Sequence, residues 1–304
     1  MKEKIVITGG SGLLALNWGV TFRDQFSIVL AMHERSIELK NVKTIKVNIE
    51  SIDSIITILK TTKPRIVVHT VALTNVEECE LNPNLAKHIN VNLSVNIATA
   101  CSILGLPMIH ISTDHLFSGN EPFTDETQRY HAKNIYASTK ADAEMRVLEV
   151  NPAALIIRTN FYGWGPRHRR SFSDFIIDSL RSRKKIILFK DVFYTPILAE
   201  SLVQIAHELI AKESFGVFNV VGDDRISKYE FGQKIAKYFD LDSNFISSGF
   251  MSEQDNLVDR PLDMSLSNKK TSEFLGRKLG GVDEQIQRLR KLEEIGIAKE
   301  LLEI

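Results

Sequence analysis

A glycine turn near the N-terminus restricts the fold of this chain more than any other sequence feature. The run IVIT at residues 5–8 predicts a strand, and Gly9-x-x-Gly12-x-x-Ala15 follows it directly and opens a predicted helix. Gly9 permits a tight turn, Gly12 lets the backbone approach a pyrophosphate, and a small third residue lets the helix pack on the strand. Free N–H groups at the helix start favour a bound phosphate. The turn therefore predicts a dinucleotide-binding βαβ unit, with a glycine-rich turn that binds no ligand as the alternative.

The first half of the chain alternates short β-branched runs with longer helical stretches. This alternation is typical of a parallel sheet that helices cover on both faces. After residue 158 the rhythm changes, because an aromatic, glycine-rich and basic loop follows at residues 161–170. Further strands are expected at residues 28–31, 43–47, 65–69, 108–112, 154–158 and 216–220, and helices at 85–104, 172–183, 228–239 and from 283 onward.

These patterns predict an α/β protein, a Rossmann-type doubly wound parallel sheet with a smaller α+β substrate lobe. The dinucleotide-binding domain is expected to span residues 1–160, with a returning segment at about 186–222. Residues 161–185 and 223–304 are expected to form the substrate-binding lobe, and the two parts to pack around a cleft.

The composition excludes several classes of partner. The 304 residues include 38 basic and 38 acidic ones, so no overall charge attracts nucleic acid or an anionic membrane. No apolar run approaches the roughly 18 residues of a membrane span, and the two cysteines are too few for a disulfide framework. No histidine has a second ligand at a metal-like spacing, so we expect no metal site. We therefore expect a cytoplasmic protein.

Tyr136 and Lys140 are four residues apart on a predicted helix and therefore share one face. A free tyrosine has a pKa of about 10, which is too high for acid–base work at neutral pH. A cation about 5 Å away, at an effective dielectric of about 20, is worth roughly 3 kcal/mol and lowers that pKa by about two units. Lys140 is thus expected to make Tyr136 a usable proton donor, with a solvated helix face as the alternative.

Ordered motifs run along nearly the whole chain. They are the glycine turn, residues 71–80 (VALTNVEECE), 112–119 (STDHLFSG), Tyr136-x-x-x-Lys140, 158–163 (RTNFYG), Thr195-Pro196, 216–222 and Arg260-Pro261. Together they resemble the extended short-chain dehydrogenase/reductases, and within that superfamily the chain most resembles the dTDP-4-dehydrorhamnose reductase family. It departs from the family pattern at Ala15, His115 and Phe161, where a glycine, another aromatic residue and a tryptophan are usual, which leaves the sugar and the base open.

The resemblance implies reduction of the 4-keto group of a nucleotide-activated deoxysugar by hydride transfer from NADPH or NADH. Tyr136 would protonate the developing alkoxide, Thr113 would hydrogen-bond the same oxygen, and Lys140 would hold the nicotinamide ribose. The expected partner is a nucleotide-diphospho-sugar, and such families are usually homodimers. The predicted cofactor-binding residues are Gly9, Ser11, Gly12, Leu13, Leu14, His33, Arg35, Val71, Ala72, Leu73, Tyr136 and Lys140. The predicted substrate-binding residues are Thr74, Asp114, His115, Asn160, Phe161 and Arg260.

The residues after the second predicted strand bear on the choice of cofactor. NAD enzymes usually place an acid there on the ribose 2′-hydroxyl, whereas NADP enzymes use an arginine on the 2′-phosphate. Glu34 fits NAD, but His33 and Arg35 favour NADP(H), so NAD(H) is the alternative.

Several roles stay open. Asp114 is expected to orient Thr113, to bind a sugar hydroxyl or to cap the backbone. The basic cluster at residues 167–170 predicts a phosphate clamp or a solvated loop. Among functions, a 4-epimerase and a non-catalytic regulatory subunit are alternatives. A 4,6-dehydratase is disfavoured because Asp114-His115 lacks the expected acidic pair, and a serine hydrolase because no G-x-S-x-G motif exists.

Overall fold

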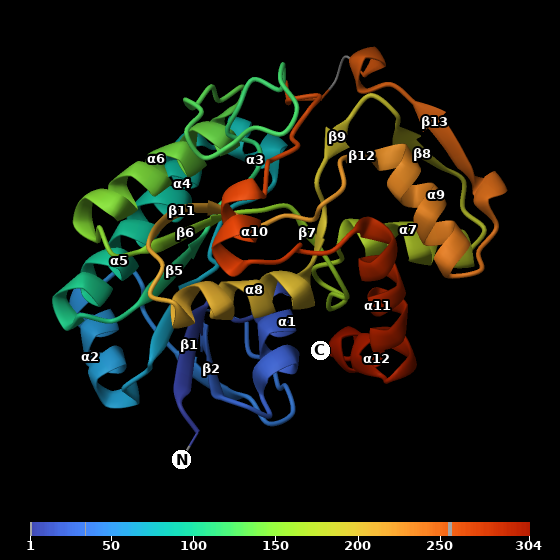
Figure 1. Ribbon diagram of the computed structural model, residues 1–304. Coiled ribbons are helices and arrows are strands. Elements are labelled where there is room, and N and C mark those ends of the chain that lie inside the picture. Colours follow the sequence, from blue (N-terminus) through green and yellow to red (C-terminus); the bar gives the residue numbers. More distant parts are fainter. Residues whose placement is uncertain (1, 34, 255–256) are drawn as a thin grey trace.

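The computed structural model describes residues 2–33, 35–254 and 257–304. Its centre is a seven-stranded parallel sheet in the order β11-β6-β5-β4-β1-β2-β3 (Figure 1). The order reverses between β1 and β4, which is the point where ligands bind in open α/β sheets. The strands are β1 (Lys4–Thr8), β2 (Ser27–Met32), β3 (Lys43–Lys46), β4 (Ile66–His69), β5 (Met108–Ile111), β6 (Leu155–Arg158) and β11 (Gly216–Asn219). The predicted Rossmann-type fold is confirmed.

Helices cover both faces of this sheet because successive strand side chains point to opposite sides. Ile5 and Ile7 of β1 pack with α1 (Leu13–Phe22) and α8 (Ala199–Ala211). Val6, between them, belongs to the apolar cluster on the other face. The helices on that face are α2 (Ile52–Thr62), α5 (Leu93–Leu104) and α6 (Ile135–Val150).

The single helix expected at residues 85–104 is divided. Pro83 begins a short helix, a position that proline favours. A π-helical turn at His88–Asn92 then separates it from α5. Within this turn Asn90 is buried, and its side chain accepts a hydrogen bond from the Leu73 N–H (2.7 Å) and donates one to the Leu73 carbonyl (3.1 Å). Asn90 therefore fixes the loop after β4. The helices are α3 (Val76–Leu81) and α4 (Pro83–Lys87).

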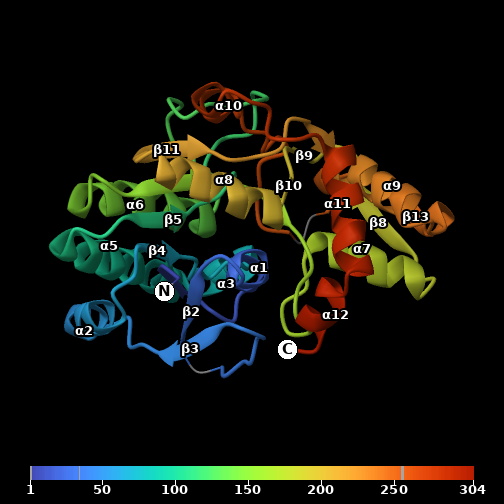
Figure 2. The same cartoon turned by 60° about the horizontal axis from the view of Figure 1, so that its bottom comes forward.

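The remaining elements pack beside the sheet as a second lobe (Figures 1 and 2). Of the predicted returning segment, β11 joins the central sheet and α8 packs on its face, whereas β8 pairs with β13. The predicted domain boundaries stay a prediction. The helices of this lobe are α7 (Phe172–Arg181), α9 (Lys228–Tyr238), α11 (Val282–Glu294) and α12 (Ile297–Leu302). The exception is α10 (Lys269–Leu275), which packs on β11 at the edge of the central sheet. The strands are β7 (Phe161–Tyr162), β8 (Ile186–Phe189), β9 (Phe193–Tyr194), β10 (Ile197–Leu198), β12 (Ile226–Ser227) and β13 (Ile246–Gly249).

One apolar core joins the sheet to the second lobe. Trp18 of α1, Trp164 and Leu289 of α11 are buried in the same cluster. The indole N–H of Trp164 donates to the Leu289 carbonyl at 2.9 Å, which satisfies its buried polar group. The second lobe is therefore packed on the α1–α8 face of the sheet. None of the described helices is both long and apolar enough to cross a membrane.

Candidate active site

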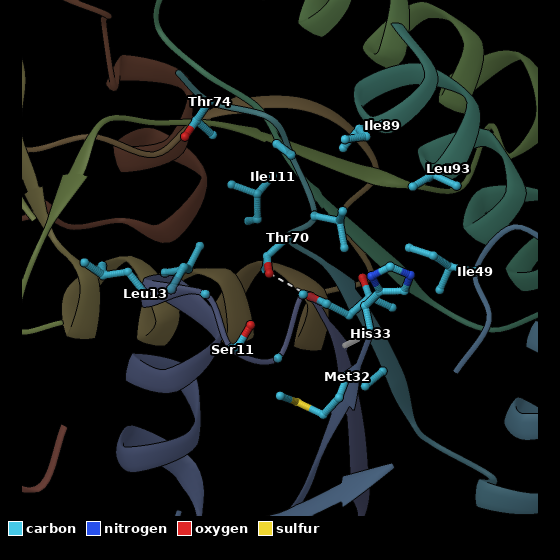
Figure 3. Close-up of a pocket in the computed structure, with 18 of the residues that line it drawn as sticks. Ser11, Leu13, Met32, His33, Ile49, Thr70, Thr74, Ile89, Leu93 and Ile111 are labelled. Carbon is cyan, nitrogen blue, oxygen red and sulfur yellow. Dashed lines mark hydrogen bonds between the residues drawn. The ribbon is translucent and has the colours of Figure 1, made fainter. Parts of the chain in front are cut away.

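A cavity of about 770 Å³ opens at the carboxyl edge of the sheet, and we call it the first cavity (Figure 3). Figure 3 shows Ser11 and Leu13 of the glycine turn on its wall, with His33 and Thr74 at separate ends. Arg35 is exposed and does not line this cavity, and Leu73 does not line it either. The predicted residues that do line it are Gly9, Ser11, Gly12, Leu13, Leu14, His33, Val71, Ala72, Thr74, Tyr136, Lys140 and Phe161. Glu34 lies outside the described residues.

The glycine turn delivers the start of α1 to this cavity. Gly9 has a φ of +74°, and a Cβ atom there would lie 2.8 Å from Thr70 Oγ1, so only glycine fits without strain. The Gly12 N–H donates to the Gly9 carbonyl at 2.8 Å, and Gly12 is the N-cap of α1. At the N-terminus of α1, backbone groups rather than side chains therefore face the cavity, which allows a phosphate to approach closely.

Tyr136 lies in the first turn of α6, where Asn134 caps the helix by accepting from the Ala137 N–H at 2.8 Å. Its side chain lines the first cavity and is 8% exposed. Burial raises the pKa of Tyr136 to about 12, while hydrogen bonding with Thr113 and the charge of Arg169 oppose this rise. The expectation that Lys140 lowers this pKa below its ordinary value was therefore wrong, because burial of the phenol outweighs the surrounding charges.

Lys140 is almost completely buried beneath the same cavity, at 2% exposure. Its ammonium donates to the Ile111 carbonyl at 2.8 Å and lies 3.4 Å from His110 Nε2. Burial lowers the pKa of Lys140 to about 8, and the nearby Glu144 carboxylate opposes this shift. Two groups of β5 therefore hold the ammonium at the strand end, one helical turn from Tyr136.

Thr113 and Asp114 follow β5 and are both buried. The Thr113 hydroxyl donates to Asp114 Oδ1 at 3.3 Å, and Asn160 Nδ2 donates to Asp114 Oδ2 at 2.6 Å. The His115 N–H donates back to Thr113 Oγ1 at 3.3 Å. Of the roles considered for Asp114, orientation of Thr113 agrees with this geometry, because the carboxylate bridges Thr113 and Asn160.

A second cavity of about 280 Å³ lies in the second lobe, and it combines aromatic rings with positive charge. His115 lines it, and the His115 ring is also 5.6 Å from the Tyr136 ring. Arg260 lines it and forms an ion pair with Glu77. Lys228, which the sequence did not indicate, lies with its ammonium 3.4 Å from the Tyr194 ring centre, and burial lowers its pKa to about 8. The aromatic lining residues are Phe172, Phe175 and Phe189.

Two residues of the basic cluster at 167–170, for which the sequence predicted a phosphate clamp or a solvated loop, also line the first cavity. His168 lies with Nε2 3.0 Å from the Ser11 carbonyl, and Arg169 donates to the Thr74 hydroxyl. Arg170, from the same cluster, binds Asp178 at 2.7 Å instead. Among the described residues, no group of three or more histidine, cysteine, aspartate or glutamate side chains could hold a metal ion.

Three curated relatives align over most of this chain. The "Probable low-salt glycan biosynthesis reductase Agl14" of Haloferax volcanii is 28% identical over 84% of this chain and 86% of its own. A dTDP-4-dehydrorhamnose reductase of Aggregatibacter actinomycetemcomitans is 25% identical over 75% of this chain and 76% of its own. Methionine adenosyltransferase 2 subunit beta of Bos taurus is 26% identical over 81% and 75%, respectively. Relatives that are reductases support the predicted oxidoreductase class.

Solved structures share the fold. A dTDP-4-dehydrorhamnose reductase of Bacillus anthracis, in complex with NADP, superposes with a TM-score of 0.84 at 24% identity, over 96% of this chain and 99% of that one. The Bordetella bronchiseptica enzyme WbmG, in complex with NAD, gives 0.79 at 19% identity, over 100% and 98%. The sequence model of the RmlD substrate binding domain family matches residues 3–293. Because this match spans nearly the whole sequence, the chain belongs to the RmlD substrate binding domain family.

Proposed function

We propose that this protein uses a nicotinamide cofactor to reduce the 4-keto group of a nucleotide-activated deoxysugar, with NADPH favoured over NADH. One observation supports this most strongly. Tyr136 and Lys140 line the cavity into which the glycine turn opens, and Thr113 lies near enough to Tyr136 to oppose the rise in its pKa. We also propose that the protein is a homodimer, on the resemblance alone, and that it is cytoplasmic, on the composition alone.

The first cavity fits a dinucleotide. Gly9 and Gly12 leave backbone rather than side chains at the start of α1, where a pyrophosphate is favoured. Lys140 uses a carbonyl and an imidazole of β5, and its three donors allow a further bond to a ribose hydroxyl. The preference for NADPH rests on His33, which lines the cavity, rather than on Arg35. When bound, the reduced cofactor supplies the hydride that attacks the keto carbon.

Tyr136 is the proton donor in this proposal. Its raised pKa keeps the phenol protonated at neutral pH, so the proton is available when the substrate oxygen gains negative charge. An alkoxide is much more basic than a phenolate, so the proton moves from Tyr136 Oη to the former carbonyl oxygen. In the complex the Thr113 hydroxyl would turn its single O–H from Asp114 to the same oxygen, and the Lys140 ammonium would stabilise the phenolate that forms.

The second cavity is the proposed site for the nucleotide part of the substrate. Its phenylalanine rings suit stacking of a base, and Lys228 and Arg260 suit a diphosphate. His115 lines this cavity and also contacts the Tyr136 ring edge-on, so it connects the two sites. A sugar nucleotide with its base in the second cavity would therefore bring its sugar towards Tyr136.

The similarity to methionine adenosyltransferase 2 subunit beta favours a second candidate, a non-catalytic nucleotide-binding subunit. Such a subunit needs neither a buried lysine nor a tyrosine at the start of α6 facing the cavity, whereas this chain contains both.

Turnover distinguishes the two candidates. The purified protein is given NADPH or NADH with dTDP- and UDP-linked 4-keto-6-deoxysugars, and oxidation of the cofactor is followed by absorbance. We expect turnover, and we expect Tyr136→Phe to lower kcat by about 100-fold or more while cofactor affinity is retained. Cofactor binding without turnover on any keto-sugar would favour the regulatory subunit. A Tyr136→Phe variant as active as the wild type would exclude the proposed mechanism.

A further inference from the structure

The loop at residues 166–170, which we call the basic loop, contacts the wall of the first cavity at two places. His168 and Arg169 are both exposed, and both line that cavity. His168 Nε2 is 3.0 Å from the Ser11 carbonyl in the glycine turn, and Arg169 donates to the Thr74 hydroxyl beyond β4. The basic loop therefore bridges the glycine turn and the loop after β4 at the cavity.

The charges that line the first cavity are few. Among its described lining residues, Lys140 and Arg169 are the lysine and arginine side chains, and Glu50 is the acidic one. Lys140 is buried and bound to the Ile111 carbonyl, and Glu50 pairs with His88 at 2.9 Å. Arg169 is thus the only exposed, permanently charged cation among these residues. A dinucleotide brings a pyrophosphate with two negative charges into the same space.

The present partner of Arg169 is a weak competitor for its guanidinium. Thr74 offers a neutral hydroxyl and is itself exposed to solvent. A phosphate oxygen carries a negative charge and adds ion-pair attraction to the hydrogen bond, which a neutral hydroxyl cannot do. The Arg169 charge also opposes the rise in the pKa of Tyr136, so the guanidinium lies within electrostatic range of the catalytic end of the cavity.

We propose that Arg169 is a cofactor-binding residue, whose guanidinium leaves Thr74 and binds a pyrophosphate oxygen of the dinucleotide beside the glycine turn. The inference rests on the proposed function, because it requires a dinucleotide in the first cavity. NADPH and NADH share the pyrophosphate, so Arg169 should contribute equally to the binding of both, whereas His33 should distinguish them.

The test compares Arg169→Gln and Arg169→Lys with Arg167→Gln. Arg167 is exposed in the same loop and does not line the first cavity, so its substitution removes the same charge from a neighbouring position. Dissociation constants for NADPH and NADH are measured by calorimetry at two salt concentrations. We expect Arg169→Gln to weaken the binding of both cofactors by about tenfold, and Arg169→Lys to weaken it by about threefold. Arg167→Gln should change it by less than about twofold.

The salt dependence of cofactor affinity gives an independent readout, because dissolved ions screen exposed charges. The wild-type affinity should fall with added salt more steeply than that of Arg169→Gln. Equal affinities for Arg169→Gln and Arg167→Gln would overturn the inference and leave the proposed function intact, as would a loss confined to NADPH. A wild-type protein that binds neither cofactor would overturn both the inference and the proposed function.

Discussion

His115 lines the second cavity and contacts Tyr136 of the first, but the chain builds the two cavities in different ways. The first cavity is made by the ends of β1, β2, β4 and β5 with the first turns of α1 and α6. In a parallel sheet these ends share one edge, so the topology alone brings them together. The second cavity takes residues from α7, β8, α9 and the 3₁₀ turn Met251–Glu253, together with Arg260. Only tertiary packing brings those segments together.

The linings differ accordingly. Glycines and small residues of a rigid turn line the first cavity, which suits a ligand that is bound mostly by backbone. Aromatic rings and the cations Lys228 and Arg260 line the second cavity, which suits recognition of a particular ligand. We infer that the general fold determines the first cavity, whereas side chains particular to this chain determine the second.

The largest expected effect concerns the support of the first cavity. Arg158 of β6 and Glu144 of α6 form an ion pair at 2.8 Å, and their side chains are 2% and 0% exposed. Glu144→Ala leaves the Arg158 charge buried without its partner, so we expect a loss of about 3–5 kcal/mol in the free energy of unfolding, measured with urea. In the second lobe, breaking the exposed Lys234–Asp283 pair with Asp283→Asn should cost at most about 1 kcal/mol. Equal losses would contradict the comparison.

Lys140→Met separates catalysis from stability within the first cavity. Loss of the ammonium should lower kcat by about 100-fold or more, because the phenolate loses its stabilising charge. The same change should raise the melting temperature, because it removes a cation that is costly to bury. Lys60→Met, at an exposed position of α2, serves as the control and should change neither quantity. An unchanged kcat in Lys140→Met would remove Lys140 from the mechanism.

The pH dependence of stability checks the same residue. Burial lowers the pKa of Lys140 from 10.5 to about 8. Below pH 8 the side chain is protonated in both folded and unfolded chains, so the cost of burying its charge is fully present. Between pH 8 and 10.5 the unfolded chain binds more protons than the folded protein, so this cost is relieved as the pH rises. The stability advantage of Lys140→Met should therefore shrink across that window, and a constant advantage would refute the assignment.

Lys228→Met addresses the second cavity. We expect the KM for the sugar nucleotide to rise by about tenfold, because a cation that faces the diphosphate is lost. The dissociation constant for NADPH should not change, since Lys228 does not line the first cavity. Lys237→Met, exposed on the same helix, is the matched control. A loss of cofactor affinity in Lys228→Met would show that the two cavities are not independent.

The smallest expected effects concern the choice of cofactor. Arg35 does not line the first cavity, so Arg35→Gln should change the ratio of NADPH to NADH affinities by less than about twofold. His33→Gln should lower that ratio by several-fold, because His33 does line the cavity. The reverse order of effects, measured by calorimetry, would restore the role that the sequence suggested for Arg35.

The first cavity could be predicted from the sequence to a large extent, because strand ends and a glycine turn have local signatures. Where those predictions failed, the cause is packing. Leu73 packs into an apolar cluster with Val76 and Cys79 rather than facing a cofactor. The depth of burial that sets the pKa of Tyr136 has no signature in a spacing of four residues. For the second cavity, Lys228 carries no local signal, since the loop after β5 reaches it only in the folded chain.

The late position of β11 in the chain has a consequence for the synthesis of this protein. It pairs with β6 at the edge of the central sheet, yet it follows α7, β8 and α8 along the chain. A nascent polypeptide that has left the ribosome only as far as α7 therefore presents the unpaired N–H and C=O groups of β6. Such an edge is a template for pairing with another chain. During synthesis, association between neighbouring nascent chains is expected to peak before residues 216–219 emerge and to stop once they dock.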